Sequence, residues 1–373
     1  MRAMAKVVGW LAVVPMALLT LVVLSEPPTW SGAAYVLGAD ACVAALVLAG
    51  RPLAARLARL GGGLIAATVA VRVGWAGGGA TVSMSTSGEG SQRLVDRLVD
   101  ERDLSVNAAR AMAWTGAFHD PDLPELSAAM RSAYDDMARD QPDAASPVLA
   151  TYLGLERPKA SDTIEIPAAG ATDGAVIFLH GYAGNFTMSC WLFANAARRA
   201  HMTTVCPSTR WVGDWWSADG EATVRATLAV LRARGMRRVY LAGLSNGAIG
   251  ASLLATRVSG FAGLVLVSGA APEASAPGIP TLVVQGRDDG QIPASLVHGY
   301  AERAGARYVE VDAGHFAMLT RRARVEGEIS AWLLAQGLRA RSQAMREVPA
   351  SIAKAEAARG TLLAEPEAWT RRP

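Results

Sequence analysis

Gly243-Leu244-Ser245-Asn246-Gly247 is the stretch that decides the fold, because it stands between a predicted strand and a predicted helix. Residues 237–242 before it form a short, mostly apolar run that is typical of a buried strand. Residues 246–257 after it are mostly small and favour a helix. A serine at such a corner is held on a strained turn with its hydroxyl exposed, and glycines beside it prevent clashes between the strand and the helix. We therefore predict that Ser245 is a nucleophile.

His315 is the predicted general base. A serine hydroxyl needs a base to remove its proton, and that base is usually a histidine oriented by a carboxylate. His315 follows a strand-like alternation at residues 307–311 and precedes an amphipathic helical pattern at about 320–336. A loop at the carboxyl end of a strand suits a mobile base, although a loop histidine without a catalytic role is the alternative.

The acid of the triad is expected between the serine and the histidine. A buried-strand pattern at residues 281–285 leads into Gly286-Arg287-Asp288-Asp289-Gly290. Asp289 is the predicted acid and Asp288 is the alternative. Both aspartates are also residues that favour turns, so a purely structural role for the pair stays open.

Two backbone N–H groups are expected to stabilise the oxyanion of the tetrahedral intermediate. One belongs to Asn246, directly after the nucleophile. The other is expected in the loop His180-Gly181-Tyr182-Ala183-Gly184-Asn185, which follows a strand pattern at residues 175–179. We assign it to Tyr182 and expect His180 to hold the loop.

The four segments HGYAGN, GLSNG, GRDDGQIP and AGH each follow a strand pattern and occur in this order. In this respect the chain resembles the α/β-hydrolase superfamily over about residues 162–338. The resemblance implies an α/β fold, with a mostly parallel sheet and helices on both faces, and triad chemistry that needs no cofactor. The alternation of short apolar strands with helices independently favours a parallel α/β sheet.

The N-terminal part of the chain is predicted to be a membrane segment. Val7–Leu24 is an uncharged run of spanning length, Ala33–Gly50 is a second candidate, and Gly61–Gly79 is a third and weaker one. A cleaved signal peptide is the competing interpretation of the first run, but no small-x-small cleavage site follows it. Arginines gather in the loop 51–59, so the positive-inside rule places that loop in the cytoplasm. With three spans, the catalytic domain is extracytoplasmic and the protein is multi-pass.

Two charges fall inside the predicted spans. Asp40 and Arg72 are each expected seven residues from the outer end of their helix, about 10 Å below the membrane boundary. Because charges in lipid are costly and usually paired, we predict an Asp40–Arg72 ion pair. The alternative is that Arg72 reaches the interface while Asp40 is protonated.

Charge separates the two parts of the chain. Residues 1–77 contain six of the 36 basic and two of the 33 acidic residues, so the basic excess belongs to the membrane segment. The catalytic region has no basic excess, which argues against a nucleic-acid partner. No metal-ligand spacing or phosphate-binding loop is seen, and nothing indicates an oligomeric state. The predicted domains are a membrane segment at 1–79, a linker and helical segment at 80–160, the catalytic domain at 161–338 and a helical tail at 339–373.

The helical segment is predicted to contain helices at 91–102, 104–118 and 124–139, which pack against the core or lean over its entrance. The turn His119-Asp120 is expected to be solvated. Ser245 and Asp289 are too close in sequence to leave room for a large cap, so we expect an open site unless this segment covers it.

Aromatic and sulfur side chains cluster near the expected catalytic edge. Three tryptophans follow a strand that ends at Cys206, and we predict that they line the substrate pocket: Trp211, Trp215 and Trp216. Packing of their own loop or contact with the membrane interface is an equal alternative. Cys190 and Cys206 are close enough in the expected fold for a disulfide in an exported domain. Two free buried thiols are the alternative.

These observations predict a membrane-anchored serine hydrolase that cleaves carboxylic esters of small molecules or lipids. Acyl transfer or peptide cleavage with the same triad is the alternative within enzymes. A non-catalytic, membrane-tethered binding module is the alternative outside them.

Overall fold

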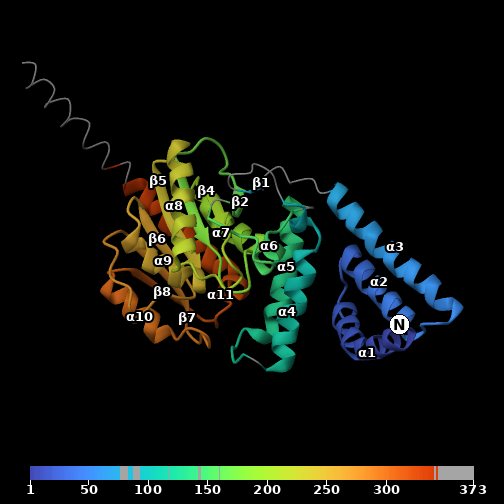
Figure 1. The fold of residues 1–373 in the computed structure, drawn as a ribbon. Helices are drawn as coiled ribbons and strands as arrows, with labels where there is room; N and C mark the ends of the chain where they lie inside the picture. Colours follow the sequence, from blue (N-terminus) through green and yellow to red (C-terminus); the bar gives the residue numbers. More distant parts are fainter. Residues whose placement is uncertain are drawn as a thin grey trace, which may run out of the picture.

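The computed structural model describes residues 1–75, 83–86, 93–116, 118–141, 144–158, 160–339 and 342 (Figure 1). Three parts follow one another along the chain: three N-terminal helices, a helical segment, and an α/β unit built on one sheet. The tail predicted at 339–373 lies almost entirely outside the described residues, as does most of the linker between residues 76 and 92.

A single mixed sheet forms the centre of the α/β unit. In the described part of the chain it contains eight strands in the order β1-β2-β4-β3-β5-β6-β7-β8. From β4 to β8 neighbouring strands are parallel, while β1 and β2 pair antiparallel at one edge. The mostly parallel sheet predicted from the sequence is therefore confirmed. The strands are β1 (Ser83–Thr86), β2 (Asp162–Ile166), β3 (Gly174–Leu179), β4 (Thr203–Pro207), β5 (Arg238–Leu244), β6 (Gly263–Val267), β7 (Thr281–Gly286) and β8 (Arg307–Val311).

Helices cover both faces of the sheet, because the central strands are apolar on both sides and must be buried on both. On one face, Phe178 of β3 packs in a cluster with α7 and the helix at residues 322–339. On the other, Ile177 packs in a cluster with α8, α9 and α10. The helices are α7 (Thr187–Arg199), α8 (Ala218–Ala233), α9 (Asn246–Arg257), α10 (Ala294–Arg303) and the short α11 (Ala317–Thr320).

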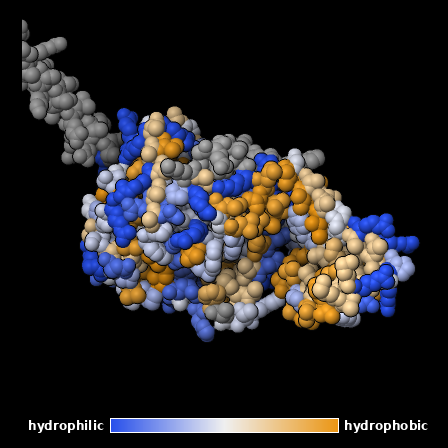
Figure 2. Space-filling view, viewed as in Figure 1, coloured by the Kyte–Doolittle hydropathy of each residue, from blue (hydrophilic) through white to orange (hydrophobic). Residues whose placement is uncertain are grey.

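Three helices at the N-terminus are long and apolar enough to cross a membrane, within the part of the chain described. They are α1 (Arg2–Leu24), α2 (Trp30–Val47) and α3 (Pro52–Trp75). Figure 2 shows that apolar side chains dominate much of their surface, whereas the rest of the molecule is more mixed. The third helix begins nine residues before the predicted Gly61, because Pro52 suits a first helical position and the Arg56 and Arg59 side chains do not interrupt a helix.

The predicted Asp40–Arg72 ion pair is wrong. The Asp40 carboxylate instead accepts hydrogen bonds from Thr20 Oγ1 of α1, at 3.1 and 3.0 Å. Arg72 lies in the last turn of α3, where its guanidinium donates to the carbonyls of Arg97 (2.7 Å) and Val99 (2.8 Å). Because α3 starts and ends earlier than predicted, Arg72 meets the helical segment and not the interior of the bundle.

The helical segment contains η1 (Leu94–Arg97), α4 (Glu101–Thr115), α5 (Leu123–Asp140) and α6 (Val148–Tyr152). The continuous helix predicted at 91–102 is wrong, since the described residues 93–100 before α4 form a single 3₁₀ turn. Asp100 then begins α4 as its N-cap, with its carboxylate accepting a hydrogen bond from the Arg102 N–H. An aspartate at this position satisfies a free helix donor and favours a new start.

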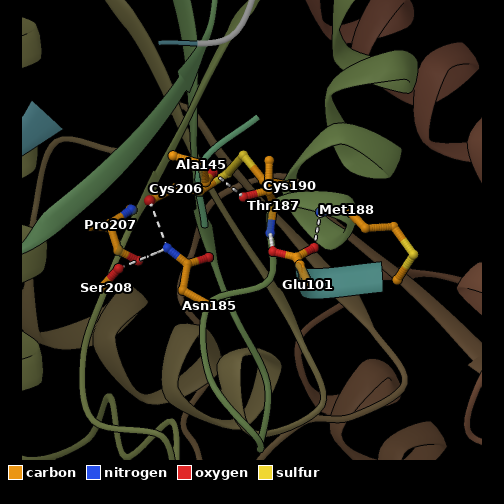
Figure 3. Close-up of a disulfide and its surroundings, with 9 residues drawn as sticks. All are labelled: Glu101, Ala145, Asn185, Thr187, Met188, Cys190, Cys206, Pro207 and Ser208. Carbon is orange, nitrogen blue, oxygen red and sulfur yellow. Dashed lines mark hydrogen bonds between the residues drawn. A yellow bond between two sulfur atoms is a disulfide. The ribbon is translucent and has the colours of Figure 1, made fainter. Parts of the chain in front are cut away.

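A buried carboxylate joins the helical segment to the α/β unit. Glu101 at the start of α4 accepts hydrogen bonds from the N–H groups of Thr187 (2.7 Å) and Met188 (2.9 Å), the first residues of α7 (Figure 3). It also accepts from the hydroxyls of Tyr134 and Ser146. Glu101 thus caps α7 from another element, where free N–H groups and the helix dipole favour an anion. Burial nevertheless raises the pKa of Glu101 above its ordinary value.

Cys190 of α7 and Cys206 of β4 form a disulfide, which is one of the two states left open by the sequence (Figure 3). Both cysteines are fully buried. Nearby, the Asn185 side chain donates to the Cys206 carbonyl at 3.1 Å and to Ser208 Oγ at 2.9 Å. The loop after β3 is therefore fixed to the end of β4.

Candidate active site

Ser245 stands at the corner between β5 and α9 in a strained backbone conformation. Its φ of 55° and ψ of −120° are rare for a residue with a side chain. A Cβ on Gly243 would lie 2.2 Å from the Gly247 carbonyl oxygen, and one on Gly247 would lie 2.0 Å from the Leu179 oxygen. Both glycines are therefore required by close backbone approach, as the sequence predicts.

Three side chains from separate loops meet at the carboxyl ends of the parallel strands. His315 Nε2 lies 2.9 Å from Ser245 Oγ. His315 Nδ1 lies 3.0 and 2.9 Å from the two carboxylate oxygens of Asp289. The structure thus brings together the predicted nucleophile, base and acid, and it pairs the histidine with Asp289 and not with Asp288.

Asp289 is held ionised by its surroundings. Burial alone would raise its pKa, but hydrogen bonds from His315 and from the N–H groups of Ile292 and Gln291 outweigh burial, so that the pKa lies below its ordinary value. Gln285 Nε2 donates a further hydrogen bond to the carboxylate at 2.8 Å. An ionised carboxylate requires the proton on His315 Nδ1, which leaves the lone pair of Nε2 facing the serine.

The strained serine turn, the strand order and the serine–aspartate–histidine succession decide the fold. The chain has the α/β-hydrolase fold. The similarities to solved structures each cover just under half of the chain. They include an α/β serine hydrolase homologue from Coxiella burnetii, with 20% identity over 46% of this chain and 91% of that chain and a TM-score of 0.41. Est1E from Butyrivibrio proteoclasticus shows 14% identity over 48% of this chain and 94% of its own, with a TM-score of 0.42.

A third similar structure is an α/β serine hydrolase without a lid from Xanthomonas campestris. It shows 20% identity over 47% of this chain and 88% of that chain, with a TM-score of 0.39. No family model matches the sequence, and no curated protein matches it either.

The predicted oxyanion donors flank the nucleophile of this hydrolase fold. Asn246 is the first residue of α9, where an N–H group has no carbonyl of the same helix to bind. The other predicted donor, Tyr182, follows Gly181, and a Cβ built on Gly181 would lie 3.1 Å from Ser245 Cβ. The ring of Tyr182 is more than half exposed, with 54% of its surface accessible.

His180 is buried beside this loop and does not reach the serine. Its Nε2 accepts a hydrogen bond from the Thr209 N–H at 3.2 Å, and Nδ1 lies 2.8 Å from the Gly181 carbonyl oxygen. The acceptor role of Nε2 places the proton on Nδ1. Desolvation lowers the pKa of His180 to about 4, so the ring is neutral and supports the loop.

Two aspartates of the loop between α4 and α5 hold the histidine loop, and the sequence reading missed both. The His315 N–H donates to the Asp120 carboxylate at 2.8 Å, and the Phe316 N–H donates to Asp122 at 2.9 Å. Asp120 also accepts from the Gly290 N–H at 3.2 Å, next to the acid. The expectation that Asp120 is solvated is wrong, since it is buried, whereas His119 is exposed.

The three predicted pocket tryptophans lie outside the cavity that contains Ser245. Trp215 is fully buried and its Nε1–H donates to the His180 carbonyl at 2.9 Å. Trp211 packs against the rings of Tyr152 and Tyr182, and Trp216 is partly exposed. Trp215 and Trp211 therefore fit the alternative, in which the tryptophans pack the loop and do not line the pocket.

The cavity at Ser245 has a volume of about 500 Å³. The helical segment forms part of its wall, so the site is not open on that side as the short spacing between Ser245 and Asp289 suggested. Residues of α4 and α5 at this wall were not predicted, because their stripes are those of any packed helix. The cavity is lined by Ser245, His315 and, among others, Ser105, Ala108, Met112, Phe118, Met130 and Leu319.

Proposed function

We propose that this protein is a serine hydrolase of carboxylic esters. The observation that carries the proposal is the continuous hydrogen-bonded relay from Ser245 Oγ through His315 to Asp289, with a cavity at the serine. A hydroxyl next to an imidazole that is itself oriented by a carboxylate is suited to nucleophilic attack on a carbonyl.

In the proposed reaction Ser245 Oγ attacks the ester carbonyl while His315 Nε2 accepts its proton. The N–H groups of Asn246 and Tyr182 stabilise the oxyanion. The intermediate collapses to an acyl-serine, and the imidazolium gives its proton to the departing alkoxide. Water then repeats the sequence: His315 takes its proton, the acyl group leaves as a carboxylic acid, and the serine recovers its hydrogen.

Replacement of the nucleophile tests the proposal. Ser245→Ala should abolish fluorophosphonate labelling and reduce ester hydrolysis by a factor on the order of 10⁶, as loss of a triad serine does elsewhere. Rates are measured with p-nitrophenyl acetate and labelling is read on a gel. Circular dichroism should show an unchanged fold. Hydrolysis that persists in the folded variant would assign the activity to another group.

We also propose that α1, α2 and α3 span a membrane and that the catalytic domain lies on the extracytoplasmic side. The turn between α1 and α2 lies beside α4, while the N-terminus and the α2–α3 turn lie at the far end of the bundle (Figure 1). That far end carries Arg2 and Lys6 at the start of α1, Arg51 in the α2–α3 turn, and Arg56 and Arg59 in the first turns of α3. The positive-inside rule therefore supports a cytoplasmic position for the end opposite the hydrolase domain.

A further inference from the structure

The wall of the catalytic cavity is built by an element outside the hydrolase core. Ser105, Ala108 and Met112 lie three and four residues apart on α4, so they form one stripe that faces the cavity. Met130 of α5 and Phe118 of the connecting loop extend the same wall. The core contributes the opposite side through α7 and the histidine loop.

Apolar side chains dominate this cavity away from the catalytic serine. Its apolar lining includes Met112, Met130, Leu192 and Leu319. Phe118, which also lines it, has 38% of its surface exposed. Methionine and leucine offer hydrocarbon and sulfur surface without a directional hydrogen bond, and methionine adapts its shape to a flexible partner. Among the lining residues of α4 and α5, Ser105 is the polar one, and its hydroxyl is already engaged with Tyr134 at 2.7 Å and with the Glu101 carbonyl. A ligand here gains by burying hydrocarbon.

The other side of α4 is fastened to the turn between the first two membrane helices. The Asp103 carboxylate accepts from the Thr29 N–H at 3.0 Å and from its hydroxyl at 2.7 Å. Arg110 donates to the Val22 carbonyl at 3.3 Å, and Arg131 of α5 pairs with Glu26. One helix, roughly 10–12 Å across, therefore separates the cavity from the end of the membrane hairpin.

We propose that α4 and α5 form an acyl-chain site, and that the substrate is a membrane lipid ester whose single hydrocarbon chain enters this site from the bilayer. The ester carbonyl then lies at Ser245, and the hydrocarbon chain of the substrate lies along the α4 stripe of Ser105, Ala108 and Met112. This inference rests on the proposed esterase function and adds the class of its substrate.

The chain-length profile of the full-length protein in detergent micelles tests the site. With p-nitrophenyl esters from acetate to palmitate, kcat/KM should rise about three- to fourfold per added CH₂, up to the length that the cavity accepts. Ala108→Trp fills the cavity and should lower kcat/KM for decanoate at least about tenfold while acetate changes less than about twofold. Ala113→Trp is the matched control, because Ala113 is exposed on the same helix and does not line the cavity.

Two results would overturn the acyl site: a rate that falls steadily from acetate onward in the unmodified protein, or an Ala108→Trp variant that affects all lengths equally. Met112→Ala, which enlarges the cavity, should shift the best substrate to a longer chain. If either of the two overturning results is found while acetate hydrolysis still depends on Ser245, the esterase function stands and only the acyl site is refuted. If no ester is cleaved in a Ser245-dependent way, the proposed function itself fails.

Whether the lipid ester enters from the bilayer or from water is tested in phosphatidylcholine vesicles that contain the full-length protein. Oleoyl-lysophosphatidylcholine is placed either in the same vesicles or in separate ones. Entry from the bilayer predicts that the ester in the same vesicles is cleaved at least about tenfold faster at early times, because the local concentration is far higher. Equal initial rates would show that the ester arrives through water and would overturn entry from the bilayer.

Discussion

His180 makes stability depend on pH because it is buried as a neutral ring. Its pKa falls from 6.5 to about 4 on folding, so between these values the unfolded chain binds the proton and the folded chain does not. Its contribution is complete above pH 6.5 and is lost as the pH falls toward 4. The expected loss is about 1.4 kcal/mol per pH unit in this window.

Thermal unfolding from pH 7.5 to 5 measures this dependence. His180→Gln should show a weaker decline of Tm with falling pH than the unmodified protein, even if its Tm is lower throughout. Other buried acids are common to both proteins, so the difference in slope reports His180 alone. Parallel slopes would mean that the pKa of His180 is the same in the folded and unfolded states, against the shift expected from its burial.

The individual residues of the candidate site were the most predictable part of this molecule. Ser245, Asp289 and His315 each follow a strand pattern, and parallel strands bring their carboxyl ends to one edge, so local sequence sufficed to propose the trio. Asp120 and Asp122 had no such signal. Their role depends on a contact across nearly 200 positions, and in sequence they resemble any turn-forming aspartates.

The loop between α4 and α5 fixes the position of His315. Asp120 accepts hydrogen bonds from the N–H groups of both His315 and Gly290, so one carboxylate ties the base loop to the acid loop. Asp120→Ala should lower kcat about 10²-fold with little change in KM, because a shift of about 1 Å in the base is that costly.

Asp120→Asn keeps an acceptor oxygen and should recover much of the rate, which a nonspecific packing defect would not do. Asp135→Ala, at a half-exposed position on α5, is the control. Activity is measured with acetate and decanoate esters, and unfolding is followed in parallel. A change confined to KM would contradict a positioning role for Asp120.

Secondary structure was predicted best where the chain is buried and regular. The bounds of β8 and α9 match the patterns at 307–311 and 246–257, whereas the start of α3 was missed. The helical stripes of α4 and α5 were visible in the sequence, but the partner of each face was not. An apolar stripe shows that a surface is covered without showing whether a core, a ligand or a membrane helix covers it.

At the scale of the whole molecule, the disulfide and the three helices that are apolar enough to span a membrane agree with the proposed sidedness. Disulfides persist in oxidising compartments, which agrees with a hydrolase domain outside the cytoplasm. In intact cells, protease added outside should remove a C-terminal tag. Without reduction, a membrane-permeant maleimide should find Cys42 as the sole free thiol among the three cysteines of the sequence. A tag protected until the cells are lysed, together with labelling of Cys190 or Cys206, would place the domain in the cytoplasm.

Glu101 limits how the proposed acyl site could admit a ligand. Moving α4 away from α7 would strip the buried Glu101 carboxylate of its two N–H donors, at a cost of several kcal/mol. The wall of the cavity formed by α4 is therefore expected to stay in place when a ligand binds. Space for a ligand must then come from rotation of the Met112 and Met130 side chains. Unbranched hydrocarbon chains are therefore expected to bind more readily than bulky groups.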